Sequence, residues 1–324
     1  MSGEHLGELA AFATTITWTI GIFPFTTAAK KLGPNEVNHF RLLLAVILLT
    51  IIVLITYRLS LQDLIQLTDS SDWLWFGLSG IVGLTLGDYF GFSSMAILGA
   101  RRVSIFTTLA PTAVLISGSL IIGEKINLAG ITGILISVSG VVMLTLSKNE
   151  KLHVEESIHG SYRFGIFCGL MSAICQGLGV VLANKGFLES GNVEPAPLHA
   201  TWIRMLTGTA VLFLFTTLRG RLPAMSRPVF RNKENGVPYM IIGTIFGPVV
   251  GVSLSMYAIS LLKDQPSVGQ TIFSLMPIFA LPIAAIFLKE KITLRSIVAV
   301  LIAVAGVIIL VWRDDIMRKL SGQA

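Results

Sequence analysis

The sequence predicts an all-α integral membrane protein with ten transmembrane helices, arranged as two inverted five-helix repeats. Three observations lead to this prediction. The 324 residues are 53% hydrophobic and 13% charged, whereas about a quarter of the residues of a soluble domain are charged. Ten apolar runs are long enough to cross a bilayer as helices, which takes about 20 residues each. The segment 109–144 recurs 166 residues later as 275–310.

The ten expected helices follow from the apolar runs in order. A membrane strand needs only about ten residues, and backbone groups in hydrocarbon must bond within their own segment, so runs of this length are helices. The short segment 58–72 between the second and third runs is either an interfacial helix or a solvated loop. The expected helices cover residues 8–29, 38–57, 73–99, 103–122, 128–147, 164–184, 197–218, 237–262, 267–288 and 292–312.

The recurring segment combines unlike residues in one register. At the offset of 166 residues, Pro111 matches Pro277 and Gly140 matches Gly306. Apolar residues would match by chance in two membrane helices, but a proline, a charged turn and a glycine would not match together. The chain is therefore a duplication. The charged residues of the repeated Glu-Lys-Ile turn are Glu124, Lys125, Glu290 and Lys291.

The long polar segment near the middle of the chain separates the two copies. Residues 149–162 form this linker, which gives one five-helix repeat at 1–148 and another at 163–324. Five is an odd number of crossings, so the second copy enters the membrane from the opposite side. This arrangement is the inverted repeat of many secondary transporters.

A glycine series in each half supports the pairing of the halves. Small residues at four-residue spacing lie on one helix face and let backbones approach closely, so we expect both helices at the crowded centre of the bundle. The alternative is that glycine is simply common in membrane helices. The series are Gly83, Gly87 and Gly91 in the third run and Gly243, Gly247 and Gly251 in the eighth.

Asp88 is the acidic residue that lies deep within an expected helix. Ionisable groups in the membrane are costly, which makes this carboxylate the first functional candidate. Two functional interpretations are open: a protonatable group that couples proton movement to transport, and a ligand for a cationic or amino group. The structural alternative is a carboxylate that pairs with a nearby arginine or caps a broken helix.

Arg41 and Arg204 each open the second helix of their half. Arg41 is expected to be shallow, and the favoured interpretation is a guanidinium that snorkels to the interface. Arg204 lies roughly two turns into its helix. At that depth two interpretations are equally favoured: an inward role in binding an anionic group or pairing an acid, and a structural role.

Further candidates have structural alternatives of equal or greater weight. Pro111 and Pro277 are expected to bend their helices, as prolines do in static bundles as well. The Glu-Lys pairs are expected to cap helix ends at tight turns. Amphipathic side chains would line a central cavity or face the interface and lipid, and these are Trp18, Tyr89, Phe92, Gln176 and Tyr257.

Other classes of function find little support in the sequence. The net charge is +6, but the basic residues sit singly or in pairs between apolar runs, as in membrane loops, which speaks against nucleic-acid binding. The run Gly77-Leu78-Ser79-Gly80 has the spelling found around intramembrane serine proteases, but the histidines lie in tails, loops or span edges, where none provides a membrane-embedded base. We expect no enzyme, no metal site and no cofactor.

Two cysteines occur, Cys168 and Cys175, within one apolar run. They lie about two helical turns apart, too far along the axis for a disulfide. We expect both to be small packing residues.

The proline segment, the Glu-Lys-Ile turn and the glycine-bearing helix at the end of each half resemble the EamA-type transporters of the drug/metabolite transporter superfamily. Gly87-Asp88 followed by Leu98-Gly99-Ala100-Arg101-Arg102 is similar to a feature of many members. The resemblance covers nearly the whole chain. It implies ten helices, a central cavity between the halves, alternating access, and usually the export of small metabolites such as amino acids without ATP.

The predicted function is a secondary transporter, expected to export a small metabolite through a mid-membrane cavity near Asp88. Exchange, facilitated diffusion and proton coupling are all open. The expected partners are a small-molecule substrate, the lipid bilayer and coupling protons, for a monomer or homodimer in the plasma (inner) membrane. The alternatives are a non-transporting binding or assembly protein with the same duplicated fold, and a selective channel.

The orientation in the membrane stays open, because two observations disagree. The resemblance implies that both termini are cytoplasmic. Of the 24 lysines and arginines, seven would then lie in cytoplasmic loops and tails, and fifteen on the opposite side. The excess of basic residues in cytoplasmic loops of known membrane proteins favours the reverse orientation.

Overall fold

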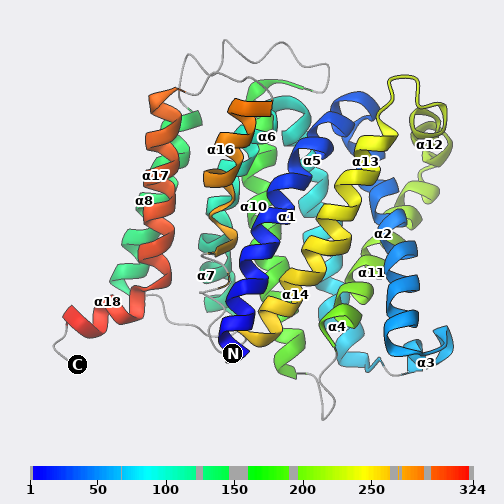
Figure 1. Cartoon of the computed structure of the whole chain (residues 1–324), viewed down its shortest axis with the longest axis horizontal. Helices are drawn as coiled ribbons and strands as arrows, with labels where there is room; N and C mark the ends of the chain where they lie inside the picture. The colour runs from blue at the N-terminus through cyan, green and yellow to red at the C-terminus, as the bar shows by residue number, and fades with distance from the viewer. Residues whose placement is uncertain are drawn as a thin grey trace.

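The computed structural model describes residues 3–66, 68–121, 127–145, 160–189, 196–262, 269, 272–287 and 293–320. Within these ranges the chain is helical and contains no β-strand. The long helices run along a common direction and form one bundle, and both chain ends lie at the same end of it (Figure 1).

The first half forms five successive helical segments, of which the third and fourth change their winding part of the way along. Gly33 joins the first two with a φ of 106°, in the left-handed region that favours glycine, and Pro34 begins the next helix where its missing N–H breaks no bond. The segments are α1 (Gly3–Leu32), α2 (Pro34–Tyr57), α4–η1–α5 (Ser70–Ser79, Gly80–Gly87, Asp88–Leu98), α6–η2–α7 (Ala100–Phe106, Thr107–Leu109, Ala110–Ile121) and α8 (Leu128–Thr145).

The second half repeats this order. Its third segment again changes its winding in the middle, at η3. The segments are α10 (Tyr162–Glu189), α11 (Pro197–Leu218), α13–η3–α14 (Val237–Thr244, Ile245–Gly251, Val252–Leu261), α16 (Met276–Phe287) and α17 (Leu294–Val311). Among the described residues, three short helices lie outside this set: α3 (Leu61–Gln66), α12 (Leu222–Arg231) and α18 (Arg313–Leu320).

Seven helical segments in the described residues are long and apolar enough to cross a membrane. Two others, Leu128–Met143 and Met276–Ile286, are apolar but shorter. Leu294–Ile309 and Arg313–Lys319 would make an eighth span only as a pair bent by 66°. The all-helical, multi-pass membrane fold is confirmed, while the number of ten transmembrane helices stays a prediction.

The observed helices differ from the predicted ones at their ends. α1 begins at Gly3 and α10 continues to Glu189, each several residues beyond the apolar run. The segment 58–72 contains the short helix α3, so the alternative of a plain loop is wrong. The basic segment 219–236 holds α12, which the sequence did not predict. Outside the described residues lie most of the linker 149–162 and the turn residues Glu124, Lys125, Glu290 and Lys291.

The two glycine series lie where the third segment of each half meets the first helix of the other half. A β-carbon built on Gly87 would lie 3.2 Å from the Cys175 β-carbon in α10, and one on Gly91 3.0 Å from the Ser172 hydroxyl oxygen. On the other side of the bundle, a β-carbon on Gly247 would lie 2.7 Å from the Phe25 ring in α1, and one on Gly251 2.5 Å from the Trp18 ring. Glycine is therefore what allows these helices to lie so close together.

Two glycines of each series lie in a π-helix, Gly83 and Gly87 in η1 and Gly247 and Gly251 in η3. Short π-helical stretches inside α-helices are rare and are frequent at functional sites. The duplication thus extends to this unusual backbone form.

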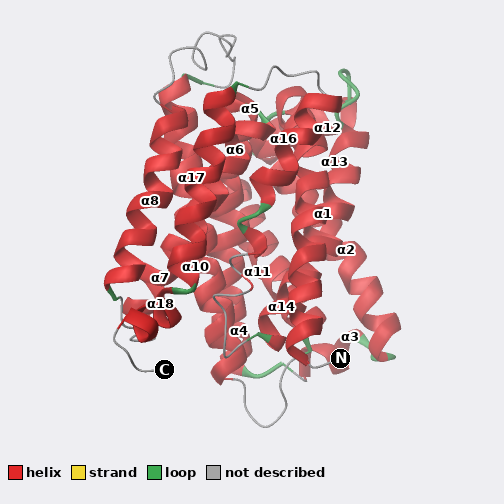
Figure 2. Cartoon of the chain, turned by 60° about the vertical axis from the view of Figure 1, so that its left-hand side comes forward, coloured by secondary structure: helices red, strands yellow, loops and turns green. Residues whose placement is uncertain are grey.

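α8 and α17 lie side by side at one edge of the bundle in both views (Figures 1 and 2). A β-carbon on Gly306 would lie 2.2 Å from the Ser137 nitrogen, and one on Gly140 2.6 Å from both the Ala299 oxygen and the Ala303 nitrogen. Equivalent glycines of the repeat therefore bring the last helices of the two halves into backbone contact.

Candidate functional site

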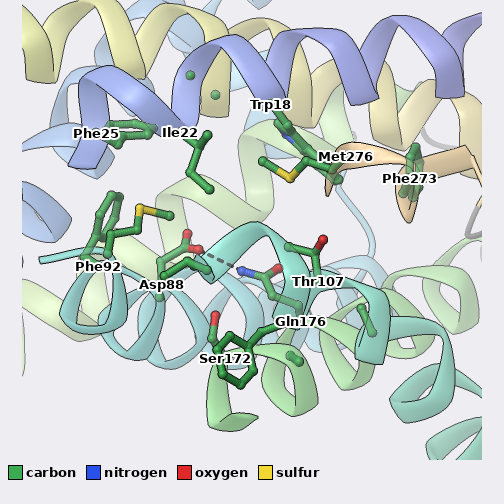
Figure 3. Close-up of a pocket in the computed structure, with 18 of the residues that line it drawn as sticks. Trp18, Ile22, Phe25, Asp88, Phe92, Thr107, Ser172, Gln176, Phe273 and Met276 are labelled. Carbon is green, nitrogen blue, oxygen red and sulfur yellow. Dashed lines mark hydrogen bonds between the residues drawn. The ribbon is translucent and has the colours of Figure 1, made fainter. Parts of the chain in front are cut away.

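A cavity of about 200 Å³ lies inside the bundle, between helices of both halves. The first half contributes α1, α2, the η1–α5 region and the α6–η2–α7 segment, and the second half contributes α10, the η3–α14 region and residues 273–276. Apolar residues make most of the wall, and polar groups gather on one side (Figure 3). The aromatic and methionine residues of the wall are Trp18, Phe25, Phe92, Met95, Phe106, Phe273 and Met276.

Asp88 forms an ion pair with Arg41 at the polar side of this cavity. One carboxylate oxygen accepts a hydrogen bond from Arg41 Nη2, and the other accepts one from Gln176 Nε2 at 2.7 Å (Figure 3). The Asp88 side chain is 20% exposed and the Arg41 side chain 3%. Both residues line the cavity, and the Asp88 carboxylate is the more exposed of the two groups.

The same polar side chains also bind the backbone of η1. Hydrogen-bonding groups buried in a membrane protein must find partners, and a change of helical winding shifts the usual backbone pairs. Three side-chain donors bond to successive carbonyls: Gln176 Nε2 to Gly83 at 3.2 Å, Arg41 Nη2 to Leu84 at 3.1 Å, and Asn38 Nδ2 to Thr85 at 3.1 Å. The ion pair is thus tied to the shape of this helix.

Arg204 lies near this cluster but is not part of the cavity wall. Its residue is 4% exposed, its Nη1 donates to the Met256 sulfur at 3.0 Å, and its Nε has no hydrogen-bond partner. Within the part of the chain that the structure describes, no carboxylate lies within salt-bridge distance of it, although its charge interacts with that of Asp88.

The favoured interpretation of Arg41 as a snorkelling side chain is wrong. The apolar run made Arg41 look shallow, but α2 begins at Pro34, so Arg41 lies about two turns inside the helix. From there its guanidinium turns inward to Asp88. The ion pair with Asp88, on another helix, orients this side chain.

The remaining candidates divide between the cavity wall and other places. Trp18, Phe92 and Gln176 line the cavity. Tyr89 and Tyr257 are not on its wall; the Tyr89 ring packs on Phe90 with centroids 5.2 Å apart, and Tyr257 is exposed on α14.

Pro111 and Pro277 each lie at the second residue of an α-helix. Pro111 is in the first turn of α7, directly after the tighter turn η2, and Pro277 is the second residue of α16. The first turn of a helix tolerates proline, because its N–H would have no partner there. The bends predicted at Pro111 and Pro277 stay a prediction.

The structure does not assemble a protease site among the described residues. The Ser79 hydroxyl donates to the Gly179 carbonyl at 2.5 Å. His39 and His199 bond to the hydroxyls of Thr216 at 2.6 Å and Thr68 at 2.9 Å, not to this serine. In the described ranges, no group of three His, Cys, Asp or Glu side chains is arranged to hold a metal ion. Both cysteines are buried and free.

Sequence reasoning named Trp18 and Phe92 but missed the rest of the apolar wall and several small polar groups. Phenylalanine and methionine occur equally in cores, in lipid-facing positions and around cavities, so nothing in their identity marked them. Ser172, Thr107 and Ser274 also line the cavity. Serines and threonines are common throughout the expected helices, so these short side chains carried no signal.

Fold and site define a multi-pass integral membrane protein with an internal cavity between two duplicated halves. The EamA-like transporter family matches residues 5–146 and again residues 163–312, and the chain belongs to this family. An uncharacterized transporter from Archaeoglobus fulgidus is 25% identical over 305 residues, which cover 92% of this chain and 96% of that protein. A solved crystal structure shares the fold, with a TM-score of 0.60 at 16% identity, covering 94% of this chain and 95% of that one.

Membership of this family makes the protein a membrane transporter. The family matches the chain twice, which confirms the duplication expected from the repeated segment.

Proposed function

We propose that the protein is a secondary transporter that exports a small amphipathic metabolite by alternating access. The observation that supports this most strongly is a cavity walled by both halves, with an ion pair on one side and an apolar wall elsewhere. Ligand sites of this kind, apolar with a few placed polar groups, suit organic molecules.

The two repeats, 1–148 and 163–324, would be the units that move. In inverted-repeat transporters, one unit rocks against the other around a site near the middle of the membrane. The glycine contacts between η1–α5 and α10, and between η3 and α1, lie where such units meet. Helices that touch through glycines can slide along each other, because no large side chain stands between them.

Asp88 is the group we propose for coupling. It is the ionisable carboxylate on the cavity wall, and it is held by Arg41 and Gln176. Protonation would remove the charge that pairs with Arg41, and Arg41 also bonds to the η1 carbonyl of Leu84. A change at the carboxylate would thereby reach the backbone of the helix that borders the cavity.

The test is counterflow of labelled small metabolites in liposomes that contain the purified protein. Saturable exchange supports a carrier, flux that does not saturate indicates a channel, and the absence of substrate-dependent flux favours a binding or assembly protein. Ser172→Trp fills the cavity and is expected to reduce exchange at least tenfold. Its matched control is Ile174→Trp on the exposed face of the same helix, which is expected to retain exchange.

A further inference from the structure

The two halves contribute unequal charge to the centre of the protein. Arg41 and Arg204 occupy corresponding places at the start of the second helix in each half. The glycine series fix the register of the third helices at an offset of 160 residues, since Gly87 matches Gly247. In this register the counterpart of Asp88 is Pro248. Each half thus supplies an arginine, but only the first supplies a carboxylate.

Pro248 lies on the cavity wall, so the second half contributes a proline to the cavity where the first half contributes the Asp88 carboxylate. Asp88 is already bonded to Arg41 and Gln176. Among the described residues, Arg204 has a methionine sulfur as its hydrogen-bond partner at 3.0 Å and a buried Nε without one. Two guanidinium groups and one carboxylate leave one positive charge without a counter-charge.

A buried charge without a partner is expensive in a membrane protein, and such groups mark ligand or ion pathways. Here the cost is reduced by any ligand that brings one negative charge. Arg204 lies within reach of the polar side of the cavity, because a β-carbon on Gly83 would lie 3.5 Å from its Nη2 and 3.9 Å from Gln176 Oε1. Gln176 in turn lines the cavity.

We propose that the cavity selects a monovalent organic anion: a carboxylate carried on an apolar, aromatic-sized body. The carboxylate would lie at the Gln176 side and be attracted by Arg204, while the body packs against Trp18 and Phe273. These two rings already contact each other, with centroids 5.2 Å apart. The proposal rests on the transport function proposed above, and it names the charge class of the substrate.

The experiment compares three probes that share a phenyl ring and differ in charge: 3-phenylpropionate, L-phenylalanine and 2-phenylethylamine, with charges of about −1, 0 and +1 at pH 7 by ordinary carboxyl and amino pKa values. Binding to the purified protein is measured by thermal shift and by tryptophan fluorescence. We expect 3-phenylpropionate to bind at least tenfold more tightly than the other two. Equal or tighter binding of phenylalanine or phenylethylamine would overturn the proposal.

Three variants test whether the excess charge causes the preference. Arg204→Gln removes it and is expected to abolish the preference for the anion, whereas Arg204→Lys keeps the charge and the preference. Asp88→Asn removes the negative charge and is expected to strengthen anion binding. A purely structural role of these residues would weaken binding in both Arg204→Gln and Asp88→Asn. If Arg204→Gln does not fold, the wild-type probe series and the Asp88→Asn variant still test the preference for the anion.

Counterflow separates this proposal from the transport function. Binding of 3-phenylpropionate without exchange would contradict transport and leave the charge preference standing. Saturable exchange of phenylethylamine in preference to the anion would support transport and refute the charge preference.

Discussion

Arg41 and Asp88 are 47 residues apart and join α2 to the first residue of α5 through a largely buried ion pair. Removing one partner of such a pair leaves the other charge buried, at a cost of about 3–5 kcal/mol. We expect Arg41→Gln and Asp88→Asn each to lower the stability of the detergent-solubilised protein by about 3 kcal/mol, with the double variant closer to wild type. Additive losses in this double-mutant cycle would show that the pair contributes no coupling.

Asp88→Asn tests the coupling role separately. The variant is expected to remain folded, although less stable, and to lose the pH dependence of exchange. In the wild type, exchange of an anionic substrate should rise as pH falls, because protonation of Asp88 removes a negative charge from the site. The other titratable groups described near this carboxylate are Arg41, Arg204 and Cys175. The readout is counterflow across a pH series, and the same pH profile in both proteins would rule out coupling through Asp88.

Gly80 and Gly77, one turn apart, form a matched pair for testing helix packing. A β-carbon on Gly80 would lie 2.1 Å from the Arg204 carbonyl oxygen in α11, whereas one on Gly77 would lie 3.4 Å from the Thr207 methyl group, an ordinary contact. We expect Gly80→Ala to destabilise the protein by about 1–3 kcal/mol and Gly77→Ala to be nearly neutral. Thermal unfolding measures both, and equal effects would contradict the packing described for η1.

Trp18 should report the binding of substrate in the cavity. Its indole lies on the wall beside Phe273 and Gly251, so a bound molecule changes its surroundings. We expect ligand-dependent fluorescence that disappears in Trp18→Phe. Trp312→Phe, which removes an exposed tryptophan that follows α17, is the control and should keep the signal. A signal that survives in Trp18→Phe would place the ligand elsewhere.

The fold was largely predictable because the physical requirements of a bilayer are simple. Length and apolarity predicted helices throughout, and the shared register of Pro111 with Pro277 and Gly140 with Gly306 predicted the duplication. Helix ends were less certain, since polar residues extend helices such as α10 beyond the apolar core. The π-helical winding of η1 and η3 had no signal beyond the glycines.

The site was predictable only where a polar side chain stood out in an apolar helix. Asp88, Gln176 and Trp18 were named for that reason, and all three line the cavity. The direction of the Arg41 side chain depends on a partner from another helix, which hydropathy does not show. Apart from Trp18 and Phe92, the aromatic residues of the wall were not predicted, because apolar residues are expected everywhere in such a chain.

The central claim is that one cavity opens to each side of the membrane in turn. Ser172 lies on its wall (Figure 3), and both native cysteines are buried. In a background with Cys168→Ala and Cys175→Ala, Ser172→Cys is treated with a membrane-impermeant maleimide in right-side-out and inside-out vesicles, with Ile174→Cys as the lipid-facing control. Alternating access predicts that Ser172→Cys is modified from both sides and the control from neither. Modification of Ser172→Cys from one side only, or from neither side, would contradict the account.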